Sequence, residues 1–128
     1  MDKIVYLCGA IAGCSDEECK EWREFVKFKI PNCLDPMIRD YRGIELGNEK
    51  EIVSKDKEDI LNSDILVYNF LKPSVGSSME VLFAYQQNKK VIIINSLGQK
   101  LSPWLIAHSH ATYLNLENFI YDYLHKNL

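Results

Sequence analysis

Apolar runs alternate with amphipathic segments along the whole chain. Uninterrupted apolar stretches predict buried β-strands at residues 3–8, 65–70 and 91–95. Weaker strand signals lie at residues 32–37 and 111–116. Apolar positions at helical spacing predict the helices between and after them, at residues 16–29, 49–64, 79–90, 103–110 and 117–128.

This alternation predicts one α/β domain covering residues 1–128. We expect a three-layer, flavodoxin- or Rossmann-like arrangement around a mostly parallel sheet of about five strands. Such sheets bind ligands at the carboxyl ends of their strands, where the strand order reverses. Three loops rich in glycine and serine fall at such ends, at residues 8–14, 71–80 and 95–104.

Charge and cysteine content narrow the class of protein. A net charge of −3 gives no general attraction to nucleic acid or to acidic membranes. The chain shows neither a signal peptide nor an apolar stretch long enough to span a membrane, so we expect a cytoplasmic protein. Its four cysteines form no CxxC pair and are expected to be free thiols.

The segment KPSVGSSMEV, residues 72–81, contains the first candidate for chemistry. The predicted helix places Glu80 in its first turn, where unpaired N–H groups favour an ionised carboxylate. Such a carboxylate could attack the anomeric carbon of a sugar. Gly76 permits a tight turn, and hydroxyl groups suited to an anion or to sugar oxygens come from Ser74, Ser77 and Ser78. The alternative is a helix cap formed by Ser77 or Ser78, with Glu80 serving only the helix dipole.

Asp56 lies inside the apolar arc of the predicted helix at 49–64, between Ile52 and Ile60 on a helical wheel. A carboxylate on an inward face costs free energy unless it is hydrogen-bonded or takes up a proton, because burial raises its pKa. A protonated Asp56 beside an ionised Glu80 would serve as general acid and nucleophile. The alternative is a polar residue at the edge of the arc, bonded to a neighbouring backbone group.

Two aromatic residues could complete a site. Tyr6, near the end of the first strand, could bring its hydroxyl to the same pocket, although composition favours a core tyrosine. Trp104 offers either a packing anchor or a surface on which a base could stack. His108 and His110 give a weak metal signal without a supporting carboxylate at helical spacing, and we expect no metal ion or other cofactor.

Taken together, these segments resemble the nucleoside 2-deoxyribosyltransferase superfamily, which includes the 2′-deoxynucleoside 5′-phosphate N-hydrolases. The resemblance covers residues 3–106 and rests on VYLCGAI, KDKEDILNSDILV, PSVGSSMEVLFAY followed by KKVIII, and LSPW. It implies an enzyme that cleaves or transfers the N-glycosidic bond of 2′-deoxyribonucleosides or of their 5′-monophosphates. It also implies a homo-oligomer that acts on this small-molecule substrate without a cofactor.

The resemblance also assigns roles to individual residues. Glu80 would attack C1′ and form a covalent glycosyl intermediate, Asp56 would hold and protonate the leaving base, and Tyr6 would orient Glu80. Ser74 resembles the phosphate-contacting serine of the N-hydrolases, at a position where the transferases have an acidic residue. Ser102 falls where the family lends a polar group to the 5′ end in a neighbouring subunit. Further substrate contacts are expected from Gly9, Ala10, Ile11, Gly76, Ser77, Ser78 and Trp104.

The first loop departs from the N-hydrolases. Ala10 and Ala12 stand where those enzymes show a serine and an arginine, so part of a phosphate cradle is missing. The choice between transferase and hydrolase therefore stays open. Two other interpretations also remain: a glycohydrolase that uses Glu80 on NAD or another ribonucleotide, and a non-catalytic nucleotide-binding module.

Overall fold

The apolar runs form the strands of one parallel sheet. In the computed structural model, which describes residues 2–128, the strand order is β2-β1-β3-β4-β5 and every neighbouring pair is parallel. The strands are β1 (Val5–Cys8), β2 (Cys33–Leu34), β3 (Ile65–Asn69), β4 (Lys90–Ile94) and β5 (Ala111–Tyr113). This order is the flavodoxin-like one, and it confirms the predicted fold class.

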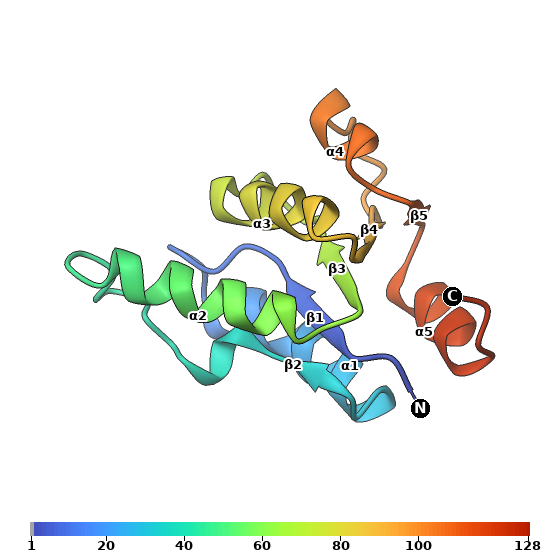
Figure 1. Cartoon of the computed structure of the whole chain (residues 1–128), viewed down its shortest axis with the longest axis horizontal. Coiled ribbons are helices and arrows are strands. Elements are labelled where there is room, and N and C mark those ends of the chain that lie inside the picture. The colour runs from blue at the N-terminus through green and yellow to red at the C-terminus, as the bar shows by residue number, and fades with distance from the viewer. Residues whose placement is uncertain (1) are drawn as a thin grey trace.

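Helices cover both faces of the sheet (Figure 1). They are α1 (Trp22–Lys29), α2 (Glu49–Leu61), α3 (Val75–Gln86), α4 (Pro103–Ala107) and α5 (Leu116–Leu124). A π-helical turn precedes α1 and a 3₁₀ turn, Pro36–Ile38, follows β2. Helices α1 and α5 pack together, α2 packs beside α3, and α4 lies against α3.

Alternation along β1 decides which side chains face which layer. Val5 and Leu7 pack into the core that contains α1 and α5. Tyr6 and Cys8 point to the other face and pack into the core that contains residues of α2 and α3. Because successive strand residues point to opposite faces, Tyr6 and Cys8 present their polar groups to the same layer.

A buried arginine fixes the carboxyl end of β1. The guanidinium of Arg23, in α1, donates hydrogen bonds to the carbonyl oxygens of Leu7 at 3.2 Å, Gly9 at 3.1 Å and Cys19 at 2.6 Å. Its Nε also lies 3.7 Å from a carboxylate oxygen of Asp35. A fully buried charge needs such partners, since an unpaired one is very costly. The loop after β1 is therefore held in one position.

Helix α3 begins earlier than the sequence predicted. Its first residue is Val75, because the Ser74 hydroxyl caps the helix by accepting a hydrogen bond from the Ser77 backbone N–H at 3.3 Å. The predicted start at residue 79 was wrong, and so was the cap assigned to Ser77 or Ser78. As a consequence, Glu80 lies in the second turn of α3 and beyond the unpaired N–H groups of its first turn.

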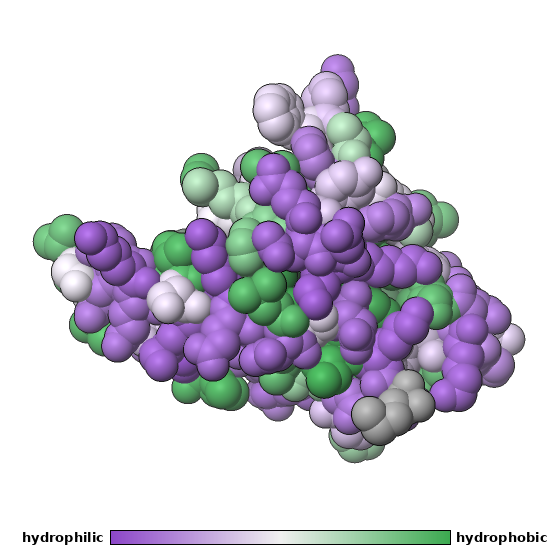
Figure 2. Space-filling model, viewed as in Figure 1, coloured by the Kyte–Doolittle hydropathy of each residue, from purple (hydrophilic) through white to green (hydrophobic). Residues whose placement is uncertain are grey.

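The surface is mostly hydrophilic on the face shown in Figure 2, with separate hydrophobic patches. One patch, at the left edge, lies over the segment that precedes α2 in Figure 1. None of the helices described between residues 2 and 128 is long and apolar enough to cross a membrane. All four cysteines are free thiols, as predicted.

Candidate active site

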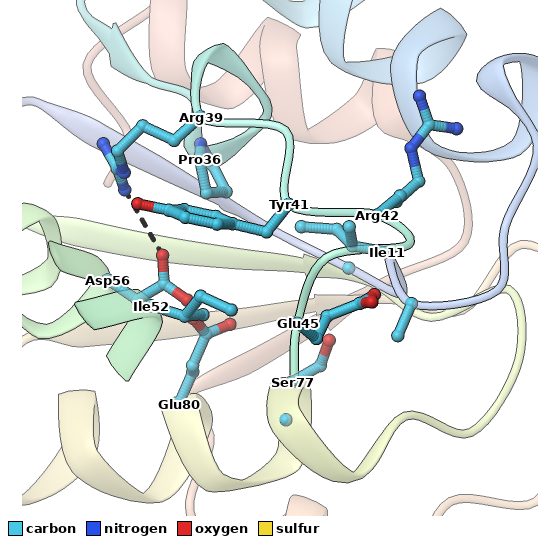
Figure 3. Close-up of a pocket in the computed structure, with 13 residues that line it drawn as sticks. Ile11, Pro36, Arg39, Tyr41, Arg42, Glu45, Ile52, Asp56, Ser77 and Glu80 are labelled. Atoms are coloured by element: carbon cyan, nitrogen blue, oxygen red, sulfur yellow. Dashed lines mark hydrogen bonds and ion pairs between the residues drawn. The ribbon is translucent and has the colours of Figure 1, made fainter. Parts of the chain in front are cut away.

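A pocket of about 170 Å³ opens between α2, α3 and the loops that follow β1 and β2 (Figure 3). The strand order changes direction here, since β2 lies on one side of β1 and β3 on the other. This is the position at which doubly wound sheets bind ligands. Three segments that the sequence singled out contribute to its lining: the loop after β1, helix α2 and the start of α3.

The carboxyl group of Glu80 lies at the floor of this pocket and receives two hydrogen bonds from β1. The Tyr6 hydroxyl donates to its Oε2 at 2.7 Å, and the Cys8 thiol donates to its Oε1 at 3.4 Å. Glu80 is half-buried, and it lines the pocket while these two hydrogen bonds hold its carboxyl group against β1. The alternation that turned Tyr6 and Cys8 to one face thus gives one carboxylate two neutral donors.

Burial controls the protonation of Glu80. Burial raises the pKa of Glu80 to about 8, and the nearby charge of Asp56 acts in the same direction. The hydrogen bonds from Tyr6 and Cys8 lower this pKa without reversing the shift. This shift favours the protonated form of Glu80 in the free protein. The sequence placed Glu80 in the first turn of its helix, and this position was wrong, because Glu80 lies one turn too far along α3 for the helix N-terminus to hold it ionised.

Asp56 reaches into the pocket from α2, toward Glu80 (Figure 3). Nη2 of Arg39 donates to Asp56 Oδ1 at 3.3 Å and to Asp59 Oδ2 at 2.7 Å. Burial raises the pKa of Asp56, while hydrogen bonds with Glu80 and with Arg39 lower it. The predicted inward acid is therefore present. Its partners are side chains of other segments, in contrast to the alternative of a neighbouring backbone group.

Two carboxyl groups this close titrate as a pair that holds one proton between them. The sequence predicted this proton on Asp56, with Glu80 ionised. In the free protein the proton instead favours Glu80, because Arg39 pairs with Asp56 and only neutral donors contact Glu80. Transfer of the proton to Asp56 would leave Glu80 as an ionised nucleophile and Asp56 as an acid.

The loop after β1 forms one side of the pocket with Gly9, Ile11 and Ala12. A Cβ atom on Gly9 would lie 2.8 Å from the ring of Trp22, so glycine is required where the loop passes α1. Ala10 points elsewhere and lines a separate small hollow. Two of the three predicted contacts in this loop, Gly9 and Ile11, therefore face the pocket.

The serines and Trp104 divide between two places. Gly76 and Ser77 line the pocket beside Glu80. Ser74 is the helix cap and does not line it. A second hollow, between α3 and α4, is lined in part by Ser78, Ser102 and Trp104. The predicted substrate contacts outside the pocket are thus Ala10, Ser74, Ser78, Ser102 and Trp104.

Sequence reasoning missed the loop that follows β2. In Figure 3 this loop forms the upper side of the pocket with Pro36, Arg39, Tyr41 and Arg42, and it reaches down to Ser77 with Glu45. The short strand before this loop gives only a weak sequence signal. The sequence instead favours residues 95–104 as the third ligand-binding loop. Two arginines and a tyrosine in a polar segment at the same sheet edge were the signal that could have identified it.

Within residues 2–128, His, Cys, Asp and Glu side chains form no group of three or more that could hold a metal ion. His110 accepts a hydrogen bond at its Nδ1 from the Val91 backbone N–H at 2.9 Å. Nδ1 of His108 lies 2.7 Å from the carbonyl oxygen of Trp104. Both histidines therefore make local structural contacts.

Neither a protein-family model nor a curated protein matches the sequence. Solved structures do match. A 2-deoxyribosyltransferase from Bacillus psychrosaccharolyticus aligns with a TM-score of 0.74 and 18% identity, over 91% of this chain and 89% of its own. A conserved protein from Enterococcus faecalis V583 aligns with a TM-score of 0.78 and 14% identity, over 98% and 99%.

A third structure, the CMP N-glycosidase BcmB of Clostridium botulinum, aligns with a TM-score of 0.59 and 15% identity, over 98% of this chain and 100% of its own. The chain has the fold of these proteins. The first is named for the transferase activity to which the sequence resemblance pointed, and the third is named for hydrolysis of a ribonucleotide, the class that the sequence left as an alternative. At identities of 14–18% the likeness shows the shared fold.

Proposed function

We propose that this protein cleaves the N-glycosidic bond of 2′-deoxyribonucleosides or their 5′-monophosphates and passes the sugar to a second base or to water. One observation carries the proposal: the Glu80 carboxyl lies at the floor of a pocket, held by Tyr6 at 2.7 Å and facing Asp56. A pair of carboxyl groups with unequal surroundings is what glycoside cleavage with a covalent intermediate requires.

The proposed steps use these residues alone. The shared proton passes from Glu80 to Asp56, and Asp56 gives it to the leaving base while the bond between C1′ and the base nitrogen breaks. The ionised Glu80 oxygen forms a new bond to C1′ through an oxocarbenium-like transition state. A second base or a water molecule then attacks C1′ and gives a proton to the ionised Asp56 while the bond between C1′ and Glu80 breaks, so the configuration at C1′ is retained.

Tyr6 and Cys8 hold Glu80 during these steps. Burial and the neighbouring Glu80 raise the pKa of both groups well above their ordinary values, so both remain protonated donors. A neutral donor can stabilise the ionised carboxylate without fixing its charge permanently. Glu80 is therefore oriented toward the pocket in both protonation states.

The solved structures support this proposal through what their names say of them. One is a 2-deoxyribosyltransferase and another is a CMP N-glycosidase, so the fold hosts both transfer and hydrolysis of a bond between a sugar and a base. The site in this chain supplies the residues for the step that the two reactions share. The acceptor decides between them.

The test is product analysis by chromatography. The protein is incubated with the four 2′-deoxynucleosides and their 5′-monophosphates, with and without adenine as acceptor. Glu80→Gln is the inactive variant, and Glu58→Gln, on the exposed side of α2, is its matched control. Free base without acceptor indicates a hydrolase, and a new nucleoside formed only with adenine indicates a transferase. Absence of any Glu80-dependent product would overturn the proposal.

A ribonucleotide is the second candidate substrate, because the neighbour from Clostridium botulinum is named for CMP. The same incubation with CMP, other ribonucleotides and NAD tests it, and faster release of base from ribose compounds would favour it. A non-catalytic nucleotide-binding module would behave differently. The wild type and the Glu80→Gln variant would then bind nucleotide equally well, and neither would release base from any compound.

We also propose a homo-oligomer, in which the hollow between α3 and α4 meets a second copy. Trp104 is 70% exposed and Met79 is 67% exposed, and both line this hollow beside Ser78 and Ser102. Exposed apolar side chains of this size mark an interaction surface. Light scattering should give a mass above 14.8 kDa for the wild type and a lower mass for Trp104→Glu. A monomeric wild type would contradict the proposal.

A further inference from the structure

We propose that this site takes a nucleoside with a free 5′-hydroxyl group and that Glu45 excludes a 5′-phosphate. The inference rests on the proposed function, which leaves the phosphorylation state of the substrate open. It depends on the distribution of charge along the pocket. The solved structures do not suggest this preference, because one of them is named for CMP, which carries a phosphate.

Glu45 lies at the end of the pocket that would receive the 5′ end of the sugar. If Glu80 attacks C1′ while Asp56 holds the base, the 5′ end must point away from Asp56. That direction leads to Ile11 and Ser77, which line the opposite end. Figure 3 shows Glu45 above Ser77, on the side away from Arg39 and Asp56. A phosphate on the sugar would therefore approach a carboxylate.

Among the pocket-lining residues that the structure describes, no free cation balances Glu45 at this end. Arg42 also lines the pocket, but its guanidinium points away from it, toward the loop after β1 (Figure 3). There it forms a salt bridge with Asp40 at 2.7 Å, another with Asp16, and a hydrogen bond to the Cys14 carbonyl oxygen at 3.0 Å. The hydrogen bonds with Asp40 and Asp16 raise the pKa of Arg42, and all these partners keep its charge away from a ligand.

The other arginine is at the wrong end and is also paired. Arg39 contacts Asp56 at 3.3 Å and Asp59 at 2.7 Å. Between residues 2 and 128, every Lys or Arg that lines the pocket thus has carboxylate partners. A bound phosphate dianion would lose its water without gaining an ion pair, while facing the like charge of Glu45.

The start of α3 compensates only through a partial charge and not through an ion pair. The partial positive charge of a helix N-terminus favours anions, but the Ser77 N–H there is already bonded to the Ser74 hydroxyl at 3.3 Å. A 5′-hydroxyl group has the opposite relation to Glu45, because it can donate a hydrogen bond to the carboxylate. Hydrogen bonds of this kind, with one ionised partner, are stronger than those between neutral groups.

The test uses Glu45→Gln, with Glu49→Gln as the matched control. Glu45 accepts a hydrogen bond from the Gly43 backbone N–H at 2.9 Å, and a glutamine oxygen can keep that bond while removing the charge. Glu49 accepts from the Gly47 N–H at 3.0 Å in the same local arrangement, but it lies outside the pocket. The control therefore loses an equivalent charge from the same stretch of chain.

The quantity measured is the ratio of kcat/KM for each deoxynucleoside to kcat/KM for its 5′-monophosphate. The wild type should favour the nucleoside, Glu45→Gln should lower the ratio about tenfold, and Glu49→Gln should leave it unchanged. Calorimetry with one deoxynucleoside and its monophosphate gives the same ratio from binding alone. A wild type that prefers the monophosphate, or a ratio unaffected by Glu45→Gln, overturns the inference.

The two proposals fail in different ways. If the protein releases base from monophosphates in a Glu80-dependent reaction but not from nucleosides, the proposed function stands and the inference about Glu45 is wrong. If no base is released from any compound, the proposed function fails. Calorimetry then tests the inference. Tighter binding of the nucleoside than of its monophosphate, lost in Glu45→Gln, supports it. Equal binding of the two compounds, or no binding of either, overturns it.

Discussion

The two sides of the pocket hold their carboxyl groups by different means. On the floor, formed by β1 and α3, the half-buried Glu80 contacts the neutral donors Tyr6 and Cys8. On the loop side, formed by the segment after β2, the cation of Arg39 pairs with Asp56. Burial raises the pKa of Glu80 to about 8, whereas Arg39 opposes the rise at Asp56.

This difference shows how one chemical group acquires two roles. A cation stabilises only the ionised form of a carboxyl group, while neutral donors in a buried site leave both forms accessible. The floor therefore suits a nucleophile that must be oriented before it loses its proton. The loop side suits an acid whose proton is loosely held and easily transferred.

The largest expected effect follows from removing the floor carboxyl. Glu80→Gln should lower kcat by at least about 10³-fold, because no nucleophile remains. The same change should stabilise the fold at pH 7 by about 1–2 kcal/mol, since Gln needs no proton to be neutral. Urea unfolding at several pH values, together with base release, measures both effects.

The sign of the pH dependence follows from the raised pKa of Glu80. Between its ordinary value and about 8, the folded protein holds a proton that the unfolded chain has lost. The wild type should therefore lose stability as the pH rises through this window, and Glu80→Gln should not. A variant that is less stable than the wild type at pH 7 would show that Glu80 is ionised in the fold.

Removing the acid on the loop side should have the next largest effect. Asp56→Asn should lower kcat by about 10²–10⁴-fold, because the leaving base loses its proton donor. Wild-type activity should fall as the pH rises through about 8, when the pair loses its last proton. Without the charge of Asp56 the pKa of Glu80 falls, so the residual activity should show no such fall.

The measurement is kcat/KM from pH 5 to pH 10 for both proteins. The Glu58→Gln control should keep the wild-type profile, since Glu58 is exposed on the outer side of α2. If kcat/KM falls at the same high pH in the wild type and in Asp56→Asn, the two carboxyl groups do not share a proton.

The site residues on strands and helices could be predicted from the sequence, and those in the loop after β2 could not. Tyr6, Asp56 and Glu80 belong to regular elements whose periodicity fixes the direction of each side chain. The position of Tyr6 near the end of the first strand brought it to the pocket, and helical spacing placed Asp56 within an apolar arc. These signals survive even where a boundary is wrong, as it was at the start of α3.

Positions in the loop after β2 follow from contacts that sequence spacing does not encode. Arg39 is placed by Asp59 of α2, and Arg42 is placed both by Asp40 of its own loop and by Asp16, which precedes α1. The protonation of Glu80 was missed for a related reason. It depends on how fully the carboxyl is enclosed, and enclosure is a property of the packed structure.

The two donors on the floor should differ in strength. Tyr6→Phe removes a hydroxyl at 2.7 Å and should lower kcat about tenfold or more, while Cys8→Ala removes a thiol at 3.4 Å and should lower it about twofold to threefold. Each change should raise the pKa of Glu80, because both hydrogen bonds lower it. Kinetics as a function of pH measures the two shifts, and Cys8→Ser, which keeps a donor, should restore most of the loss. Equal effects of the two substitutions would contradict the assignment of Tyr6 as the principal donor.

A similarly small effect is expected on the loop side, from Arg39→Gln. The ion pairs of Arg39 are partly exposed, so their loss should cost only about 0.5–1 kcal/mol of stability and about threefold in kcat/KM. Removing the cation raises the pKa of Asp56, so the pair ionises first at a higher pH and the acid limb of the profile should move upward. Asp59→Asn is the sharper comparison, because it removes the second partner of Arg39 and leaves the contact with Asp56 in place. If Asp59→Asn moves the low-pH limb as far as Arg39→Gln does, the position of Arg39 controls the pKa of Asp56. If Asp59→Asn moves this limb little, the charge of Arg39 next to Asp56 is sufficient to control that pKa.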